Sequence, residues 1–176
     1  MIPNIIGYHA NEKQKCTDYI ERGIFIKSND TYWLGDGMYF WDNHSNAIYW
    51  MNEKIRKSEA VCVSIIKANV IIDKLLDFTD LETLKRFDKL WSYFCEKRNE
   101  SIKLPLGKKI EMLFDFFEDL ENEFNVLRVN ADYNKTPDIS FLYSGNNKVT
   151  HKIKTIYCVR NNDVIKNAVI EDGGLE

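Results

Sequence analysis

The chain has 176 residues and a mass of 20.7 kDa, which is enough for one domain with a hydrophobic core but short for two. Its net charge of −3 gives no overall basic surface for nucleic acid, and no run approaches the roughly 18 apolar residues of a membrane span. The four cysteines lie far apart without metal-site spacing, and the N-terminal MIPNIIGYHA has no signal-peptide pattern. We therefore expect one cytoplasmic domain over residues 1–176, with buried free thiols, no metal and no membrane contact.

The first sixty residues predict short strands that alternate with helices. In chain order we expect a strand at 5–9, a helix at 11–22, a strand at 24–26, a polar loop at 28–31, a turn and strand at 33–41, and a helix that begins at 43 or 45. Asn11 is a suitable N-cap for the first helix, and Gly23 is well placed to end it. Asn43 or Ser45 can cap the second helix.

The rest of the chain predicts two long helices between strands. We expect a strand at 60–66 that continues at 70–72, helices at 80–97 and 106–124, and strands at 139–143 and 154–160. Asp80 is the N-cap of the first of these helices. Because strands and helices do not alternate regularly, the order favours an α+β fold with a largely antiparallel sheet.

The segment WLGDGMYFWD, residues 33–42, is unusually rich in aromatic side chains beside glycines. A buried strand would explain part of this pattern. A pocket for a flat ring would also explain it, because glycine lets another molecule approach the backbone and aromatic rings stack on planar ligands. Both interpretations stay open at this point.

Among the three histidines, His9 is the best candidate for a functional role. It stands at the end of the first predicted strand, where its ring nitrogens can meet a ligand hydroxyl, although a half-exposed histidine at a turn would look the same. His44 and His151 lie in polar surroundings and are expected to face solvent.

Four segments taken together resemble the catalytic domain of ADP-ribosyltransferases of the diphtheria-toxin and poly(ADP-ribose) polymerase type. The resemblance falls on His9, on residues 23–28 (GIFIKS), on residues 34–40 (LGDGMYF) and on residues 45–49 (SNAIY). It implies an ADP-ribosyltransferase-like α+β fold with split, mostly antiparallel β-sheets, flanking helices and a two-helix insertion. It covers most of the chain in order, but only the first fifty residues match in detail.

The resemblance also implies roles for individual residues in binding NAD. Tyr39 would lie against one face of the nicotinamide and Tyr49 on the other, His9 would bind the adenosine-side ribose, and the backbone of Ala10 would meet the carboxamide. Phe40 and Trp41 are expected to be structural. The residues implied in cofactor binding are His9, Ala10, Ser28, Gly37, Tyr39, Asn46 and Tyr49.

This sequence departs from the family pattern at three places. Ala10 replaces the glycine after the histidine, and one residue fewer separates Tyr39 from Tyr49, so Asn46 or Ser45 must replace the displaced serine. The late strand has Thr155 or Ile156 where the family has an acidic residue or glutamine, and neither can act as a general base.

The implied catalytic positions are therefore His9, Tyr39, Thr155 and Ile156, and a carboxylate would have to come from elsewhere. Asp36, Glu111 and the substrate itself are candidates for that group. In the family, loss of the late-strand glutamate goes with transfer of single ADP-ribose units or with no transfer.

The resemblance thus implies a mono-ADP-ribosyltransferase that uses NAD as substrate, modifies a protein or nucleic acid and releases nicotinamide. By resemblance to small stand-alone relatives, it is expected to be a toxin or defence effector, with a possible antitoxin or regulatory partner. The alternative is an inactive module that keeps the fold to bind NAD, ADP-ribose or a protein partner. A third interpretation, a scaffold whose aromatic residues are all core, predicts no open cleft beside Tyr39 and Tyr49.

Overall fold

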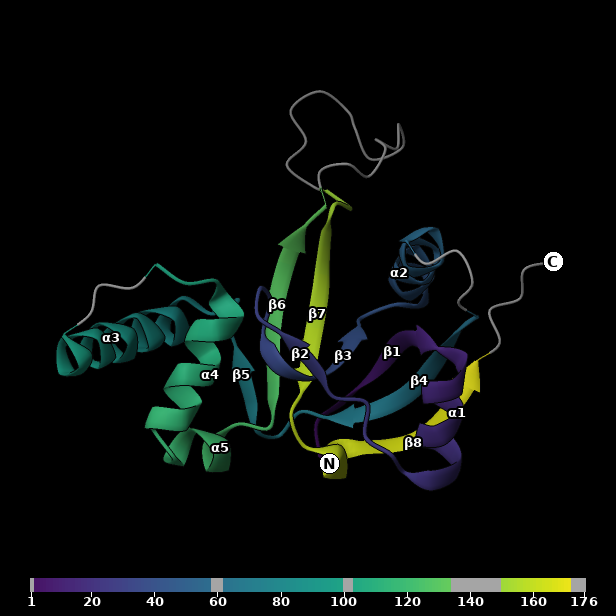
Figure 1. Ribbon diagram of the computed structural model, residues 1–176, viewed down its shortest axis with the longest axis horizontal. Helices are drawn as coiled ribbons and strands as arrows, with labels where there is room; N and C mark the ends of the chain where they lie inside the picture. The colour runs from purple at the N-terminus through teal and green to yellow at the C-terminus, as the bar shows by residue number, and fades with distance from the viewer. Residues whose placement is uncertain (1, 58–61, 100–102, 134–149, 172–176) are drawn as a thin grey trace.

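A computed structural model describes residues 2–57, 62–99, 103–133 and 150–171 (Figure 1). These residues form a mixed α+β structure, as the sequence predicts, with eight strands and five α-helices. In chain order the elements are β1 (Asn4–Glu12), α1 (Lys13–Arg22), β2 (Ser28–Asp30), β3 (Gly35–Trp41), α2 (His44–Lys57), β4 (Val63–Ile71), β5 (Leu75–Asp77), α3 (Leu81–Arg98), α4 (Leu106–Phe116), α5 (Asp119–Glu123), β6 (Val126–Asp132), β7 (Ile153–Val159) and, after a 3₁₀ turn at Asn162–Val164, β8 (Ile165–Glu171).

The strands form one sheet in the order β5-β6-β7-β3-β1-β4-β8, with β2 paired to β3. Neighbouring strands are antiparallel except β5 and β6, which are parallel. β1 and β3 meet at a single residue pair, Tyr8 and Trp41, whereas β1 pairs with β4 along its whole length. The sheet is thus nearly divided between β1 and β3, and the strands of the two parts run in clearly different directions in Figure 1.

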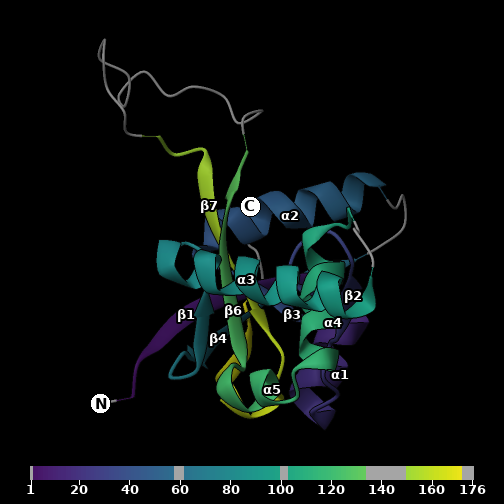
Figure 2. The ribbon, with the colours of Figure 1, turned by 90° about the vertical axis from the view of Figure 1, so that its left-hand side faces the viewer.

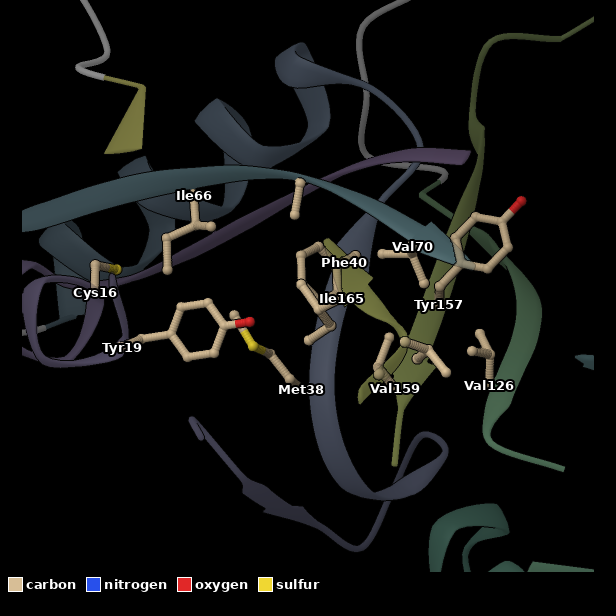
Figure 3. Close-up of a cluster of buried hydrophobic side chains, with 12 residues drawn as sticks. Cys16, Tyr19, Met38, Phe40, Ile66, Val70, Val126, Tyr157, Val159 and Ile165 are labelled. Carbon is tan, nitrogen blue, oxygen red and sulfur yellow. The ribbon is translucent and has the colours of Figure 1, made fainter. Parts of the chain in front are cut away.

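A cluster of buried side chains joins the two parts of the sheet (Figure 3). Met38 and Phe40 extend from β3 into this cluster and are fully buried. Because side chains alternate along a strand, Tyr39 and Trp41 point to the opposite face. The structural role expected for Phe40 is confirmed, and the alternation leaves Tyr39 and Trp41 on the face where the pocket described below lies.

Helices α3, α4 and α5 lie between β5 and β6 in the chain and cover one face of that part of the sheet (Figure 2). They pack against the strands through a second buried cluster, to which Leu76 of β5, Leu127 of β6 and Cys158 of β7 contribute. Asp80 caps α3 by accepting a hydrogen bond from the backbone N–H of Thr83 at 2.8 Å, as predicted.

Four expectations about local structure are wrong. Asn11 is not a helix N-cap but the penultimate residue of β1, because pairing with β4 extends the strand to Glu12. Residues 24–26 are not a strand, and most of the polar loop expected at 28–31 is instead strand β2, which pairs with β3. The helix expected at 106–124 is interrupted at Phe117, where the backbone leaves the helical region, and resumes as α5.

Other expectations are met in part. Gly23 ends α1 in the left-handed conformation, and the strand expected at 154–160 is β7. Strands β5, β6 and β8 were not expected, and the strand expected at 139–143 lies outside the described residues. All four cysteines are free thiols, but Cys62 is exposed, contrary to the expectation that they are buried.

Candidate functional site

A pocket opens on the face of the sheet where β1 and β3 separate. Its volume of about 120 Å³ exceeds that of a site for a single water molecule. Residues from β1, β2, β3, β7 and α2 converge on it, together with side chains from the loops that flank them. The lining residues are His9, Ala10, Asn11, Ser28, Asp30, Trp33, Tyr39, Trp41, Trp50, Lys54, Tyr133 and Ile156.

His9 bridges the gap between the two strands. Its Nδ1 lies 2.7 Å from the carbonyl oxygen of Tyr39, and its Nε2 lies 3.2 Å from Nδ2 of Asn11. Since a carbonyl can only accept, Nδ1 carries the proton and Nε2 accepts from the Asn11 amide. The imidazole therefore donates to a carbonyl of β3 beside the point where β1 and β3 separate.

The environment of His9 keeps the ring neutral. Burial lowers its pKa to about 4, with a smaller contribution in the same direction from the charge of Lys54. The Nζ of Lys54 donates to Oδ1 of Asn11 at 3.1 Å, so an ordered chain of hydrogen bonds runs from Lys54 through Asn11 and His9 to Tyr39. In this chain of hydrogen bonds His9 positions the backbone. Because its ring is neutral, it does not act as a general acid near neutral pH.

The low pKa of His9 predicts a loss of stability in mild acid. Unfolded, the imidazole titrates near 6.5, so between pH 6.5 and 4 the unfolded state takes up a proton that the folded state excludes. Between those pH values the free energy of unfolding should fall by about 3 kcal/mol from this group, because each pKa unit corresponds to about 1.4 kcal/mol. Urea unfolding of the wild type and of His9→Gln at pH 7 and pH 4 measures it. Equal pH dependence in the two proteins would contradict a buried neutral His9.

Tyr39 lines the pocket with its ring and fixes a turn with its hydroxyl. The hydroxyl donates to the carbonyl of Gly35 at 2.7 Å and accepts from the N–H of Leu34 at 3.0 Å. Burial raises the pKa of the phenol above its ordinary value, and nearby charges including the Asp30 carboxylate add to this effect. Tyr39 is therefore a neutral, rigidly held wall of the pocket.

Trp33 and Tyr133 both line the pocket, and their rings form a stacked pair. Their rings are nearly parallel, with 5° between the planes and 6.5 Å between the centroids. Trp41 meets Tyr133 edge-on, which holds the Tyr133 ring in this orientation.

The glycines of the segment WLGDGMYFWD are required by internal packing. Gly35 has a φ of +80°, and a side chain there would collide with the carboxylate of Glu111. A Cβ on Gly37 would lie 2.5 Å from Sγ of Cys158 and 2.6 Å from the carbonyl oxygen of Val159. Gly37 is not among the residues that line the pocket, and its contact with β7 accounts for the glycine without a ligand.

Tyr49 and Asn46 lie on α2 outside the pocket lining. The ring of Tyr49 is 37% exposed and covers the ammonium group of Lys154, whose Nζ is 4.4 Å from the ring centroid. Asn46 is buried and donates to the carboxylate of Asp42 at 2.8 Å. The residues that α2 turns toward the pocket are Trp50 and Lys54.

On the late strand β7, the two predicted positions face different ways. Ile156 lines the pocket opposite Trp41, and Thr155 donates through Oγ1 to the side-chain oxygen of Asn130 on β6 at 3.1 Å. The pocket face of β7 thus carries an aliphatic side chain at this point.

Several lining residues were not identified from the sequence. Trp50 and Lys54 have a detectable signal, because they are four residues apart on α2 and share one helical face. Asp30 and Asn11 were assigned to a loop and a cap, and Trp41 was assigned to the core. Tyr133 has no sequence signal, since only the pairing of β6 with β7 brings it to the pocket.

Two general features bear on the class of site. The described residues contain no cluster of three or more side chains able to hold a metal ion. None of the helices in the described part of the chain is long and apolar enough to cross a membrane.

Comparison with known proteins gives one distant relative. An uncharacterized protein of Methanocaldococcus jannaschii is 32% identical over 106 residues, which cover 57% of this chain and 47% of the archaeal protein. The matched region thus spans about half the length of that relative. No family model matches the sequence, and no solved structure matches the fold.

Proposed function

We propose that the protein is a mono-ADP-ribosyltransferase that transfers ADP-ribose from NAD to a macromolecule and releases nicotinamide. The observation that carries the proposal is the convergence of His9, Ala10, Ser28, Tyr39 and Ile156 on one pocket. These residues come from β1, β2, β3 and β7, and the resemblance to ADP-ribosyltransferases names them without reference to the structure. If Tyr39 only filled the core, these five residues would not be expected to line one open pocket.

The geometry supports binding of a planar ring and an adjoining anion. Four aromatic side chains line the pocket, the stacked pair Trp33 and Tyr133 together with Tyr39 and Trp41. Lys54 lies at the edge of the pocket, where its ammonium group can meet a phosphate. In this assignment the nicotinamide lies against these aromatic side chains and the pyrophosphate lies toward Lys54.

The test is incubation of the purified protein with radiolabelled NAD and a cell lysate. We expect release of nicotinamide and transfer of label to protein, RNA or DNA, and loss of both in Tyr39→Ala and His9→Ala. Circular dichroism of the two variants separates loss of activity from loss of folding. No nicotinamide release and no labelled macromolecule from the wild type would contradict the proposal.

Adjacent aromatic residues provide a matched test of the ring site. Trp33 lines the pocket, whereas Tyr32 is 75% exposed. Trp33→Ala should weaken NAD binding about ten-fold, because stacking and buried area together contribute about 1.4 kcal/mol or more. Tyr32→Ala should leave the dissociation constant unchanged. Isothermal titration calorimetry measures both, and equal affinities in the two variants would place the nicotinamide elsewhere.

One observation favours a second candidate function, a non-catalytic module that binds NAD, ADP-ribose or a protein partner. The late strand presents Ile156 to the pocket, and an aliphatic side chain cannot activate a nucleophile. Calorimetric binding of NAD or ADP-ribose without nicotinamide release would support this function over the transferase.

A further inference from the structure

A carboxylate lines the pocket although the late strand supplies none. Asp30 is the last residue of β2, and among the described residues that line the pocket it is the one acidic side chain. It comes from β2, whereas Ile156 comes from β7. The sequence alone gave no reason to select it, because it lies in what was expected to be a polar loop.

The other acidic residues near the turn are engaged elsewhere. Asp36 forms an ion pair with Lys27 at 3.0 Å, and Glu111 forms a two-pronged ion pair with Arg160. The Asp42 carboxylate accepts from the side chain of Asn46. None of these three lines the pocket, so Asp36 and Glu111, the two carboxylates suggested from the sequence, are poorly placed for chemistry there.

Asp30 is held in place through both its side chain and its backbone. Its Oδ1 accepts hydrogen bonds from the backbone N–H groups of Tyr32 at 2.7 Å and Trp33 at 3.0 Å. Its backbone pairs with Gly35 of β3, and Gly107 of α4 packs directly on its carbonyl. Of the two carboxylate oxygens of Asp30, only Oδ1 accepts hydrogen bonds from the described residues, so Oδ2 is available to a ligand.

We infer that Asp30 is the catalytic carboxylate of this site. The inference rests on the proposed transferase function and supplies the group that Thr155 and Ile156 lack. The bond between C1′ of the nicotinamide ribose and the ring nitrogen breaks, and its electron pair leaves with nicotinamide. The acceptor hydroxyl or amine forms the new bond to C1′, and its proton passes to Oδ2 of Asp30. Before the transfer, the negative charge also stabilises the cationic ribose.

The substitution Asp30→Asn separates catalysis from folding. An asparagine Oδ1 can still accept from Tyr32 and Trp33, so the turn is kept while the charge is lost. We expect kcat for nicotinamide release to fall about 100-fold, the low end of the range for general-base catalysis, with the dissociation constant for NAD unchanged. The acid limb of the kcat profile should disappear with the carboxylate. Asp36→Asn, which removes a carboxylate outside the pocket, should keep wild-type kcat.

The outcomes distinguish this inference from the proposed function. An active wild type together with an equally active Asp30→Asn would overturn the role of Asp30 and leave the transferase function intact. An inactive wild type would overturn both. Partial recovery of nicotinamide release by Asp30→Ala in added formate would support the inference further, because formate can replace the missing carboxylate.

Discussion

Alanine at Gly37 is expected to lower the free energy of unfolding by about 3 kcal/mol, the upper part of the usual range for overpacking. The φ angle of Gly37 is not in the left-handed region, so the cost comes from space alone. A Cβ there meets the carbonyl of Val159 and the sulfur of Cys158, and the backbone carbonyl cannot move without separating β3 from β7. Urea unfolding followed by circular dichroism measures the change.

Gly23→Ala is the matched control for this prediction. Gly23 has a φ of +67°, but nothing lies within 4 Å of the position of a Cβ, so alanine there incurs only backbone strain of about 1 kcal/mol. Adding Cys158→Ala to Gly37→Ala should recover part of the loss by removing one of the two contacts. If Gly37→Ala were no more destabilising than Gly23→Ala, the close approach of β3 to β7 would be wrong.

The sequence predicted best those elements whose signals are local. Asp80 followed by a regular apolar face defines α3, and Gly23 after an apolar stripe defines the end of α1, because capping and helical spacing act within a few residues. The interruption at Phe117 was missed because the apolar spacing continues across it. Two separate helices that pack on the same buried cluster show the same spacing as one long helix.

Strands that depend on distant partners were harder to predict. β5 has three residues and exists because β6 lies parallel to it, about fifty positions later in the chain. β8 alternates weakly and is an edge strand beside β4. For such strands, pairing across the sheet contributes more than the preference of the segment itself.

The candidate site shows the same division. His9 and Tyr39 could be identified because their segments resemble a known motif. Tyr133 could not be identified, because its place in the stacked pair with Trp33 follows from the order β6-β7-β3. Whether Tyr49 or Trp50 faces the pocket depends on the rotation of α2 about its axis. Neighbouring helical residues point about 100° apart, so one residue more or fewer in the preceding link changes which side chain faces the pocket.

Replacing Arg160 with methionine is expected to lower the free energy of unfolding by about 3 kcal/mol, close to the cost of breaking a buried ion pair. The side chain of Arg160 is only 13% exposed, and its guanidinium contacts both oxygens of Glu111, at 2.6 and 3.2 Å. Methionine can pack on the ring of Phe114, over which the guanidinium lies, but leaves the Glu111 carboxylate without the arginine charge. Lysine should be intermediate, because it cannot form the two-pronged contact.

The control is Lys27→Met, which breaks the more exposed ion pair with Asp36 and should change the free energy of unfolding by less than about 1 kcal/mol. Glu111→Gln in the Arg160→Met background should restore part of the stability, since the neutral amide oxygen still accepts from the N–H of Asp36. Equal effects of Arg160→Met and Lys27→Met in urea unfolding would contradict the assignment. Glu111 binds the turn whose Gly35 carbonyl accepts from the Tyr39 hydroxyl. Arg160→Met should therefore also weaken the NAD binding proposed above, although Arg160 does not line the pocket.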